Sequence, residues 1–241
     1  MTQELIAITK RGTEVTLQEI HEMYDVRAHF MRLKSSINPQ EDFQNFAAEV
    51  KNAVNVYLYK NKQNCVKGSY IEAWHFEENK ALQQKVLVIE GEYAFIHKEF
   101  QGKYLSKTIR NNRVWEFLKY PFKAKYVVGV VYPATYFMYT KHTLNHWSWL
   151  DKNIPADAQE VMQNYIDRHG LAKNDVFSGI KSMPTLPIHT TDKDIARMEK
   201  NPHYAHYLEL NPSWQQGYGL LMLAKIDFST TLLMLKKRIL G

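Results

Sequence analysis

The segment from His97 to Ile109 reads HKEFQGKYLSKTI and combines glycine, small polar and basic residues. Such a segment, placed between a strand and a helix, can present backbone N–H groups at the helix N-terminus, where the helix dipole favours an anion. Lys103, Lys107 and Arg110 would add full positive charges around the same turn. The segment is therefore a candidate phosphate cradle, although Tyr104 stands where such loops usually place glycine.

Basic residues are concentrated in and after this segment. The chain of 241 residues has 31 Lys and Arg against 25 Asp and Glu, a formal net charge of +6. Between positions 98 and 125 the sequence has eight basic and two acidic residues, a surplus as large as the net charge of the whole chain. The basic residues are Lys98, Lys103, Lys107, Arg110, Arg113, Lys119, Lys123 and Lys125. A solvated helix face and a compact polyanionic ligand both explain such a run.

Several kinds of enzyme lack their usual signals in this sequence. It has no G-x-S-x-G, no G-x-x-x-x-G-K-[ST] and no G-x-G-x-x-G after a strand pattern, so we expect no serine hydrolase, nucleotide hydrolase or dinucleotide-binding site. His142 and His146 have i,i+4 spacing, but the glutamate of a zinc-protease helix is missing between them. His203 and His206 form a similar loose pair. We expect no metal site.

The composition is that of a globular protein with a full core. Hydrophobic residues make up 45% of the chain and charged residues 23%. Cys65 is the only cysteine, so an intramolecular disulfide is excluded and a reducing cytoplasm is the expected location. The N-terminus has no secretory-signal pattern, and no apolar run approaches the ~20 residues that a membrane-spanning helix needs. We expect a soluble chain.

Two helices are predicted near the N-terminus, before the first strand. Thr16-Leu-Gln-Glu19 is a capping box, and the apolar spacing after it predicts a helix from Thr16 to about Lys34. Asn38-Pro39 predicts the start of the second helix. NVYLYKN and VKGSYIEAWHF then predict an antiparallel hairpin, and KVLVIEGEYAFIHKE predicts a strand with a bulge or bend at Gly91.

A strand–helix–strand unit follows the hairpin. LSKTIRNNRVWEFLKY predicts a helix that stops before Pro121, and KYVVGVVYP predicts a buried parallel strand, so the three elements form a right-handed βαβ crossover. PATYFMYTKHTL predicts another helix.

Residues 145–201 contain one helix, with Gly170 as its C-terminal cap, and a proline-rich loop, and we interpret them as an insertion or lid. HYAHYLEL and GYGLLMLAKI predict two final strands, and TTLLMLKKRIL is amphipathic. These elements indicate an α/β or α+β domain.

The opening segment resembles the acyl-CoA binding segment of the GNAT acetyltransferase superfamily. Members of this superfamily carry Q/R-x-x-G-x-G/A between their fourth strand and third helix. In this chain the pattern begins at Gln101 and ends at Ser106, a small residue close to Gly or Ala, with Tyr104 in the place of a glycine.

A second segment strengthens this resemblance. VVYPATYFMYTKHTL is similar to the N-x-x-A-x-x-x-Y-x-K-x-G-F pattern of the helix after the fifth strand in that superfamily. Tyr132 stands in the Asn place and Thr135 in the Ala place, whereas Tyr139 and Lys141 match. The two segments have the expected order, with a helix and a buried strand between them.

The resemblance implies a fold and a domain organisation. It covers roughly Val54 to Leu144 and implies a mixed, largely antiparallel central sheet with a βαβ crossover and helices on both faces. Residues 1–241 are expected to form a single GNAT-like domain, with 145–201 as the insertion or lid and the two final strands as the closing pair of the sheet.

The resemblance also implies an activity, which is acyl-CoA-dependent N-acyl transfer by direct attack of an amine on the thioester. The expected co-substrate is acetyl-CoA or another acyl-CoA, and the expected acceptor is the primary amine of a small molecule. Acyl-CoA would lie between the strand that ends at Lys98 and the strand that ends at Tyr132. The residues implied for its binding are Phe95, Ile96, His97, Gln101, Gly102, Lys103, Tyr104, Leu105, Ser106, Lys107 and Tyr132.

Catalysis would need an acid for the departing thiolate and a base for the amine. The match to the second motif implies Tyr139 as the acid, although packing on a helix explains the same residue. Glu90 and Glu92 are the candidates for the base, with Glu72 facing them from the neighbouring strand, and each is also compatible with a solvated strand position.

Other functions remain open. One is a GNAT-shaped acyltransferase with a longer acyl donor or a lipid-like substrate, and another is a non-catalytic module that uses the basic segment to bind a ligand, a membrane surface or nucleic acid. We do not expect nucleic acid as the main partner. The sequence does not identify the acceptor, the acyl chain or the oligomeric state, for which a homodimer is one option.

Overall fold

The computed structural model of the chain describes residues 4–100, 104–171, 180–182, 185–187 and 199–240. It has two compact units. Unit 1 comprises Met1–Trp74, Gly91–Thr108 and Pro184–His189, and unit 2 comprises His75–Glu90, Ile109–Met183 and Thr190–Gly241.

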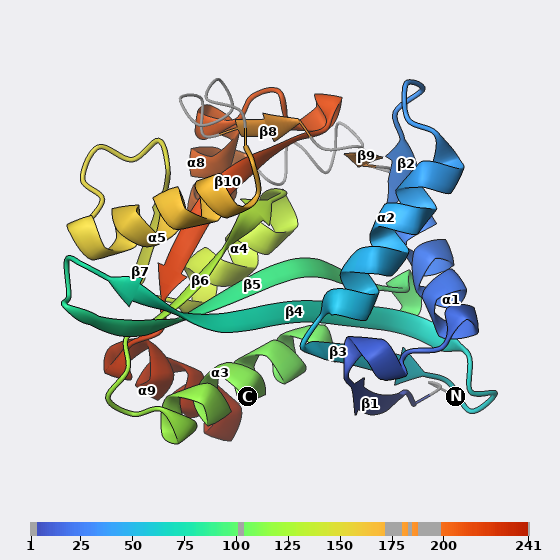
Figure 1. Cartoon of the computed structure of the whole chain (residues 1–241), viewed down its shortest axis with the longest axis horizontal. Helices are drawn as coiled ribbons and strands as arrows, with labels where there is room; N and C mark the ends of the chain where they lie inside the picture. Colours follow the sequence, from blue (N-terminus) through green and yellow to red (C-terminus); the bar gives the residue numbers. More distant parts are fainter. Residues whose placement is uncertain (1–3, 101–103, 172–179, 183–184, 188–198, 241) are drawn as a thin grey trace. The chain divides into compact units, whose positions relative to one another are not determined.

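The strands form one mixed sheet and one small antiparallel pair. The strands of the sheet are β1 (Ile6–Lys10), β3 (Asn55–Lys60), β4 (Val66–Asn79), β5 (Gln84–Ile96), β6 (Lys125–Val131), β7 (Asn145–Ser148), β8 (Ile180–Ser182) and β10 (Tyr218–Lys225). Their order is β1-β3-β4-β5-β6-β10-β7, with β8 beside β10 (Figure 1). The small pair joins β2 (Met31–Leu33) and β9 (Thr185–Pro187).

The predicted crossover is confirmed. Helix α3 (Leu105–Lys119) connects β5 to β6, and these two strands are parallel from Leu87↔Lys125 to Glu90↔Val128. The pairs β1–β3, β3–β4, β6–β10, β7–β10 and β8–β10 are antiparallel. The sheet is therefore mixed and largely antiparallel, and the predicted α/β fold class is confirmed.

Unit 1 packs two helices against the hairpin. Helices α1 (Leu17–Ala28) and α2 (Pro39–Asn52) bury Ile20, Met23, Phe46 and Val50 against Val56, Leu58 and Ile71 of β3 and β4. Gly12, in the short 3-10 helix η1 (Gly12–Glu14), lies so close to α2 that an added Cβ would be 2.1 Å from the carbonyl oxygen of Val50. Only glycine permits this approach between η1 and α2.

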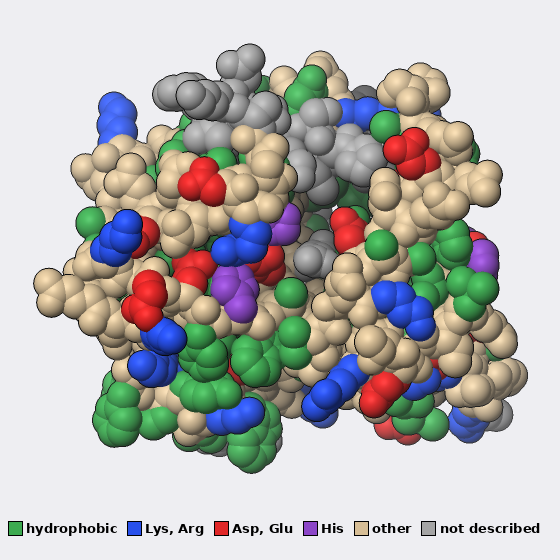
Figure 2. Space-filling model, in the orientation of Figure 1, with side chains coloured by type: hydrophobic (Ala, Val, Ile, Leu, Met, Phe, Trp, Pro, Cys, Tyr) green, Lys and Arg blue, Asp and Glu red, His purple; other side chains and the backbone are tan. Residues whose placement is uncertain are grey.

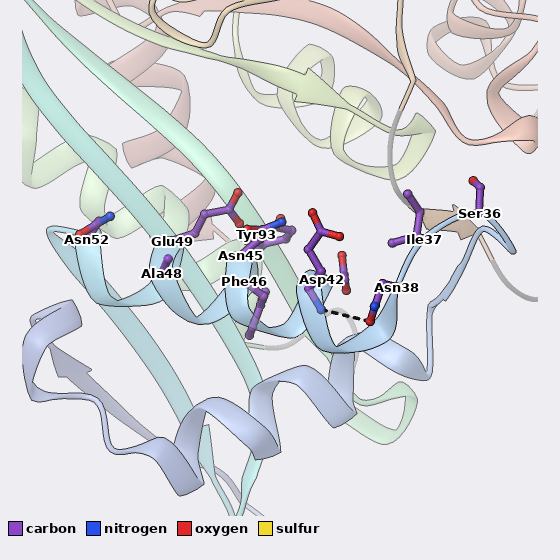
Figure 3. A pocket seen from close by; sticks show the side chains of 11 residues that line it. Ser36, Ile37, Asn38, Asp42, Asn45, Phe46, Ala48, Glu49, Asn52 and Tyr93 are labelled. Atoms are coloured by element: carbon purple, nitrogen blue, oxygen red, sulfur yellow. Dashed lines mark hydrogen bonds between the residues drawn. The ribbon is translucent and has the colours of Figure 1, made fainter.

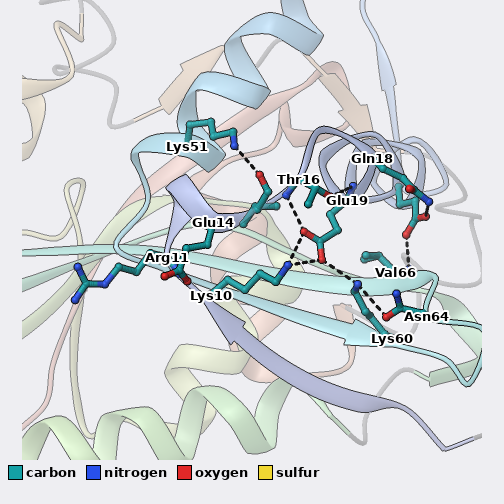
Figure 4. A network of polar contacts seen from close by, with 12 residues as sticks. Lys10, Arg11, Glu14, Thr16, Gln18, Glu19, Lys51, Lys60, Asn64 and Val66 are labelled. Carbon is teal, nitrogen blue, oxygen red and sulfur yellow. Dashed lines mark hydrogen bonds and ion pairs between the residues drawn. The ribbon is translucent and has the colours of Figure 1, made fainter.

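A buried carboxylate ties α1 to two strands of unit 1 (Figure 4). Glu19 Oε1 lies 2.7 Å from Nζ of Lys10 on β1 and 2.9 Å from Nζ of Lys60 on β3. Glu19 Oε2 accepts a hydrogen bond from the backbone N–H of Thr16 at 2.8 Å, and Thr16 Oγ1 accepts one from the N–H of Glu19. The predicted capping box is thus formed, and it also positions an ion pair in the core.

Unit 2 has helices on both faces of its part of the sheet (Figure 1). Helix α5 (Ala156–Arg168) packs Val161, Met162 and Tyr165 against Val86 and Val88 of β5 and their neighbours on β6 and β10. Lys125 precedes Tyr126 of that cluster and so points to the other face, where its Nζ lies 4.8 Å from the ring of Phe117 on α3. Phe117 in turn lies 6.1 Å from Phe228 of α9 (Phe228–Leu240).

Some secondary-structure predictions are wrong. The first helix ends at Ala28 rather than near Lys34, because Met31–Leu33 are extended and pair with β9. Strands β1 and β2 were not predicted, so the first strand comes before the helices. The segment HYAHYLEL is helix α8 (Pro202–Leu210), because the Asn201 side chain accepts from the N–H of His203 at 3.1 Å and Pro202 occupies the first turn.

The helix α8 changes the predicted closing pair of the sheet. The strand β10 forms where GYGLLMLAKI predicts it, but its partner on the outer side is β7, from the segment 145–201. The role of 145–201 as an insertion or lid stays a prediction. Among the described residues, every helix is too short or too polar to cross a membrane.

Candidate functional site

Tyr104 stands directly before α3 and belongs to the apolar core of unit 1. Its ring lies 6.2 Å from the ring of Tyr59 and 6.4 Å from that of Phe100. Its hydroxyl oxygen accepts a hydrogen bond from the backbone N–H of Leu5 at 3.1 Å, and its carbonyl accepts from the N–H of Thr108 at 3.0 Å. The residue that replaces glycine in the motif is therefore held by core contacts.

The described part of the phosphate cradle is the first turn of α3. Leu105 packs against the same apolar cluster as Tyr104, and Lys107 is exposed. Gln101, Gly102 and Lys103 lie outside the described residues, as do the side chains of Ser106 and Glu92. The cradle predicted from the sequence is thus represented by helix N–H groups and one exposed lysine.

The end of β5 supplies the residues predicted to bind the pantetheine arm. Ile96 is buried in the cluster of Tyr59 and Phe100, and the ring of Phe95 stacks on that of Phe30 at 6.2 Å. The N–H of His97 donates to the carbonyl of Lys67 on β4 at 2.8 Å.

Backbone polar groups alternate between the two edges of a strand, so the N–H groups of His97 and Phe95 face β4 whereas that of Ile96 faces the opposite edge. Of the three predicted residues, Ile96 is therefore the one with backbone groups directed away from β4. The N–H of Leu87 donates to Ala124, beside β6, at 2.9 Å. The bulge or bend at Gly91 stays a prediction.

The parallel ladder of β5 and β6 ends at Glu90↔Val128, although β5 continues to Ile96 and β6 to Val131. Beyond Val128, β6 pairs with β10 along its other edge. Tyr132 follows β6 and is the N-terminal cap of α4 (Pro133–His142), with its carbonyl accepting from the N–H of Tyr136 at 3.0 Å.

Glu90 is the centre of a polar cluster in unit 2. The residue is 5% exposed, and its carboxylate binds two residues at the end of α5: Arg168 Nη2 lies 2.6 Å from Oε1, and His169 Nε2 lies 2.9 Å from Oε2. Glu77 of β4 accepts from Arg168 Nη1 at 3.2 Å. His75 lies 3.2 Å from Glu77 and 3.9 Å from Glu90. We call these five residues the Glu90 cluster.

Both carboxylates of the cluster are held in their ionised form. Burial acts to raise the pKa of Glu90, but the hydrogen bond from His169 and the charge of Arg168 outweigh it and hold the pKa below its ordinary value. Burial opposes ionisation of Glu77 as well, and the contacts with His75, Asn164 and Arg168 hold its pKa low. A carboxylate paired in this way is a weak base, so the geometry of Glu90 suits the orientation of a neighbouring group. Direct proton removal by Glu90 stays a prediction.

Helix α5 is fixed at both ends. At its N-terminus, Asp157 binds Lys225 Nζ at 2.7 Å and accepts a short hydrogen bond from the hydroxyl of Tyr126. At its C-terminus, Gly170 has φ of 56°, and the N–H of Leu171 donates to the carbonyl of Ile166 at 3.1 Å. The predicted cap at Gly170 is thus confirmed.

Arg168 and His169 were not predicted as site residues. They precede Gly170 in a segment interpreted as an insertion, and their partner Glu90 lies 78 and 79 positions away along the chain. Two basic side chains directly before a predicted helix cap are the one local signal that could have drawn attention to them.

Tyr139 lies on the buried face of α4. The residue is 8% exposed, and its carbonyl accepts from the N–H and the hydroxyl of Thr143 at 2.9 and 2.8 Å. Tyr136, one turn earlier, packs against Tyr207 of α8 at 5.2 Å. Packing in the core is thus observed for this helix face, and the role of Tyr139 as acid stays a prediction.

Fewer basic side chains of residues 98–125 are accessible to an anionic ligand than the sequence suggests. Arg113 is 1% exposed and pairs with Glu116 at 2.6 Å. Lys125 is fully buried and donates to the carbonyl of Lys123 at 2.7 Å, and burial lowers its pKa to about 8. Lys107, Lys119 and Lys123 are exposed. The charges that a polyanion could reach are therefore fewer than the surplus between positions 98 and 125.

Unit 1 contains a cavity of about 440 Å³ along α2 (Figure 3). Its lining includes Asn38, Asp42, Asn45, Glu49, Asn52 and Tyr93. Asp42 is bound by the buried Arg27 at 2.6 Å and by the Tyr24 hydroxyl at 2.6 Å. Most polar groups along this helix face are carboxylate or amide oxygens, which suit a cationic or hydrogen-bond-donating ligand.

Among the described residues, no group of three or more His, Cys, Asp or Glu side chains is arranged to hold a metal ion. His142 ends α4 whereas His146 lies on β7, so the i,i+4 spacing of the two histidines does not place them on one helix.

No family model matches the sequence, and no curated protein matches it with significance. Solved acetyltransferase structures resemble the chain. An acetyltransferase of the GNAT family from Staphylococcus aureus Mu50 has a TM-score of 0.39 and 10% identity, over 63% of this chain and 90% of its own. Tetrahymena GCN5 has a TM-score of 0.43 and 10% identity over 93% and 96%. The NatC complex bound to Gag peptide and CoA has a TM-score of 0.40 and 9% identity over 62% and 92%.

At such identities and TM-scores we draw no conclusion from these similarities about the activity of the chain or the role of any residue.

Proposed function

We propose that the chain is an acyl-CoA-dependent N-acyltransferase that transfers an acyl group, with acetyl as the expected one, to the primary amine of a small molecule. The observation that carries the proposal is the β5–α3–β6 crossover: the first GNAT-like motif lies between β5 and α3, the second follows β6, and the parallel ladder ends at the buried residue Glu90. The reaction is a direct attack of the amine on the thioester.

The donor is assigned to the residues that the first motif implies. The N–H groups of the first turn of α3 and the exposed Lys107 favour the phosphates of CoA. Ile96 is the best placed of the strand residues to pair with the pantetheine arm, because its backbone groups face away from β4. Tyr139 is proposed to protonate the departing thiolate.

The acceptor is assigned to a cationic amine. The two ionised carboxylates of the Glu90 cluster favour an ammonium group over an anion. This supports a small amine as acceptor.

Two measurements test the proposal. Acetyl-CoA and longer acyl-CoAs at millimolar concentration are expected to raise the melting temperature, because a ligand that binds only the folded state stabilises it. Thiol release from acetyl-CoA over a panel of amines is expected to show turnover that falls in Tyr139→Phe. The absence of stabilisation by any acyl-CoA would count against the function, whereas turnover unchanged in Tyr139→Phe would remove only the assigned acid.

A second candidate function is acyl transfer to a lipid-like acceptor at a membrane surface. Large apolar side chains are exposed on α3, on the turn after it and on α9, and Figure 2 shows apolar side chains gathered over this region. They are Trp115, Leu118, Phe122, Phe228 and Leu232, and Phe122 is 92% exposed. Sedimentation with anionic vesicles, repeated with Phe122→Ser, separates this candidate from the first: binding that depends on Phe122 favours it.

A further inference from the structure

His169 and Glu90 have the geometry of an oriented imidazole–carboxylate pair. His169 Nε2 lies 2.9 Å from Glu90 Oε2, and the side chains are 31% and 7% exposed, respectively. An ionised carboxylate only accepts hydrogen bonds, so Nε2 carries the hydrogen and Nδ1 of the neutral ring carries the free lone pair. Among the described residues, Nδ1 has no hydrogen-bond partner. The buried oxygen thus holds one ring nitrogen and leaves the other for a ligand.

The orientation of the ring is supported from two elements, α5 and β4. On α5, the ring of Tyr165 lies 4.2 Å from that of His169, and Arg168 binds the other oxygen of Glu90. On β4, Glu77 and His75 surround the same arginine and carboxylate. Figure 2 shows histidine, acidic and basic side chains together on the face that carries α5. The anchored N-terminus of α5 and the cap at Gly170 fix where this last turn lies.

The pair lies at the end of the parallel ladder in unit 2. Glu90 is the last residue of β5 that pairs with β6 in this ladder, and the cluster around it comes from β4, β5 and α5 of the same unit. The cluster has two carboxylates and one guanidinium, so a cationic amine nearby would balance its charge.

We propose that His169 is the general base that takes a proton from the acceptor amine, and that Glu90 is a positioning residue that holds its ring; this inference rests on the proposed function. The amine nitrogen forms a C–N bond to the thioester carbonyl carbon, and the C–S bond breaks. The ammonium loses two protons in all: one goes to Nδ1 of His169 and then to solvent, and the other ends on the departing sulfur. The oriented imidazole thus replaces Glu90 itself as the direct base.

The test compares His169→Gln with the control His206→Gln in the full chain. His206 Nε2 also faces a carboxylate, at 3.8 Å from Asp151 Oδ1, but it lies outside the Glu90 cluster, so the control removes an imidazole that the proposal does not use. In the thiol-release assay we expect kcat of His169→Gln to fall about 100-fold, the scale of general base catalysis, with its ascending pH limb lost, and that of His206→Gln to change little. The melting-temperature shift with acetyl-CoA should be kept in both.

Chemical rescue separates catalysis from structure. Free imidazole should restore part of the turnover of His169→Ala, because it supplies the missing base, and should not restore Glu90→Gln. If the unsubstituted chain turns over acetyl-CoA and His169→Gln has the same kcat and pH profile, this inference is overturned and the proposed function is not. A wild-type chain that neither binds nor turns over any acyl-CoA overturns the proposed function and the inference with it. A loss of kcat that is equal in the two variants, without rescue, also overturns the role of His169.

Discussion

Tyr104 accepts a hydrogen bond from the backbone N–H of Leu5 at 3.1 Å, although the two residues are 99 positions apart. This contact ties the start of α3 to the chain just before β1, in unit 1. Leu5 is buried, so its N–H would otherwise have no access to water. The tyrosine that departs from the motif of an acyl-CoA loop is therefore a structural anchor, and its removal has a measurable cost.

Tyr104→Phe should lower the free energy of unfolding by about 1–2 kcal/mol, because it leaves the N–H of Leu5 unpaired while keeping the ring in its cluster. Tyr104→Gly should cost about 3–5 kcal/mol, because it also opens a cavity beside Tyr59 and Phe100. Urea unfolding followed by tryptophan fluorescence measures both. Unchanged stability in Tyr104→Gly would show that the ring contributes nothing to the core.

Local signals predicted the elements better than the contacts between them. The capping box at Thr16 and Glu19, the hairpin and the cap at Gly170 depend on neighbouring residues, so the sequence indicated them correctly. The extended residues of β2 were assigned to the first helix because their partner, β9, lies far along the chain. The contact of Glu90 with Arg168 has the same origin, since it joins residues 78 positions apart and leaves no local pattern.

Unit 1 should lose stability in acid through Glu19. Burial acts to raise the pKa of Glu19, but the hydrogen bonds from Lys10 and Lys60 lower it from 4.5 to about 2. Between these pH values the unfolded chain binds the proton and the folded chain does not, so the stabilisation is complete above pH 4.5 and is lost as the pH falls towards 2.

The melting temperature between pH 2 and 6 tests whether stability decreases as the pH falls. Glu19→Gln should be destabilised at pH 6, and its difference from the wild type should shrink towards pH 2. The control is Glu78→Gln, which removes an exposed pair with Lys85 at 3.6 Å and should change little at any pH. A difference that grows as the pH falls would contradict the role of Glu19.

Charge reversal on α3 should weaken acyl-CoA binding at one end of the helix only. Lys107 lies in the first turn and Lys119 in the last, and both are exposed. Lys107→Glu should raise Kd for CoA about tenfold at low salt, since it replaces an attraction to phosphate by a repulsion, and the effect should decrease at high salt. Lys119→Glu makes the same charge change and should leave Kd nearly unchanged. Calorimetric titration of both variants with CoA measures the two Kd values. An equal loss of affinity in both variants would show a general effect of charge instead of a phosphate cradle at the start of α3.

Gly170→Ala should lower both kcat and stability, because it changes the backbone conformation at the C-terminal end of α5. Gly170 has φ of 56°, a conformation that costs an L-residue about 1 kcal/mol, and an added Cβ would meet nothing within 4 Å, so the cost is purely conformational. Relief of this strain would turn the adjacent His169 away from Glu90, so we expect kcat to fall several-fold together with a small loss of stability. Gly170→Asn is the matched control, because Asn adopts the left-handed conformation more readily and should keep most of both. Wild-type kcat in Gly170→Ala, measured beside an unfolding curve that shows the loss of stability, would mean that the position of His169 does not limit the reaction.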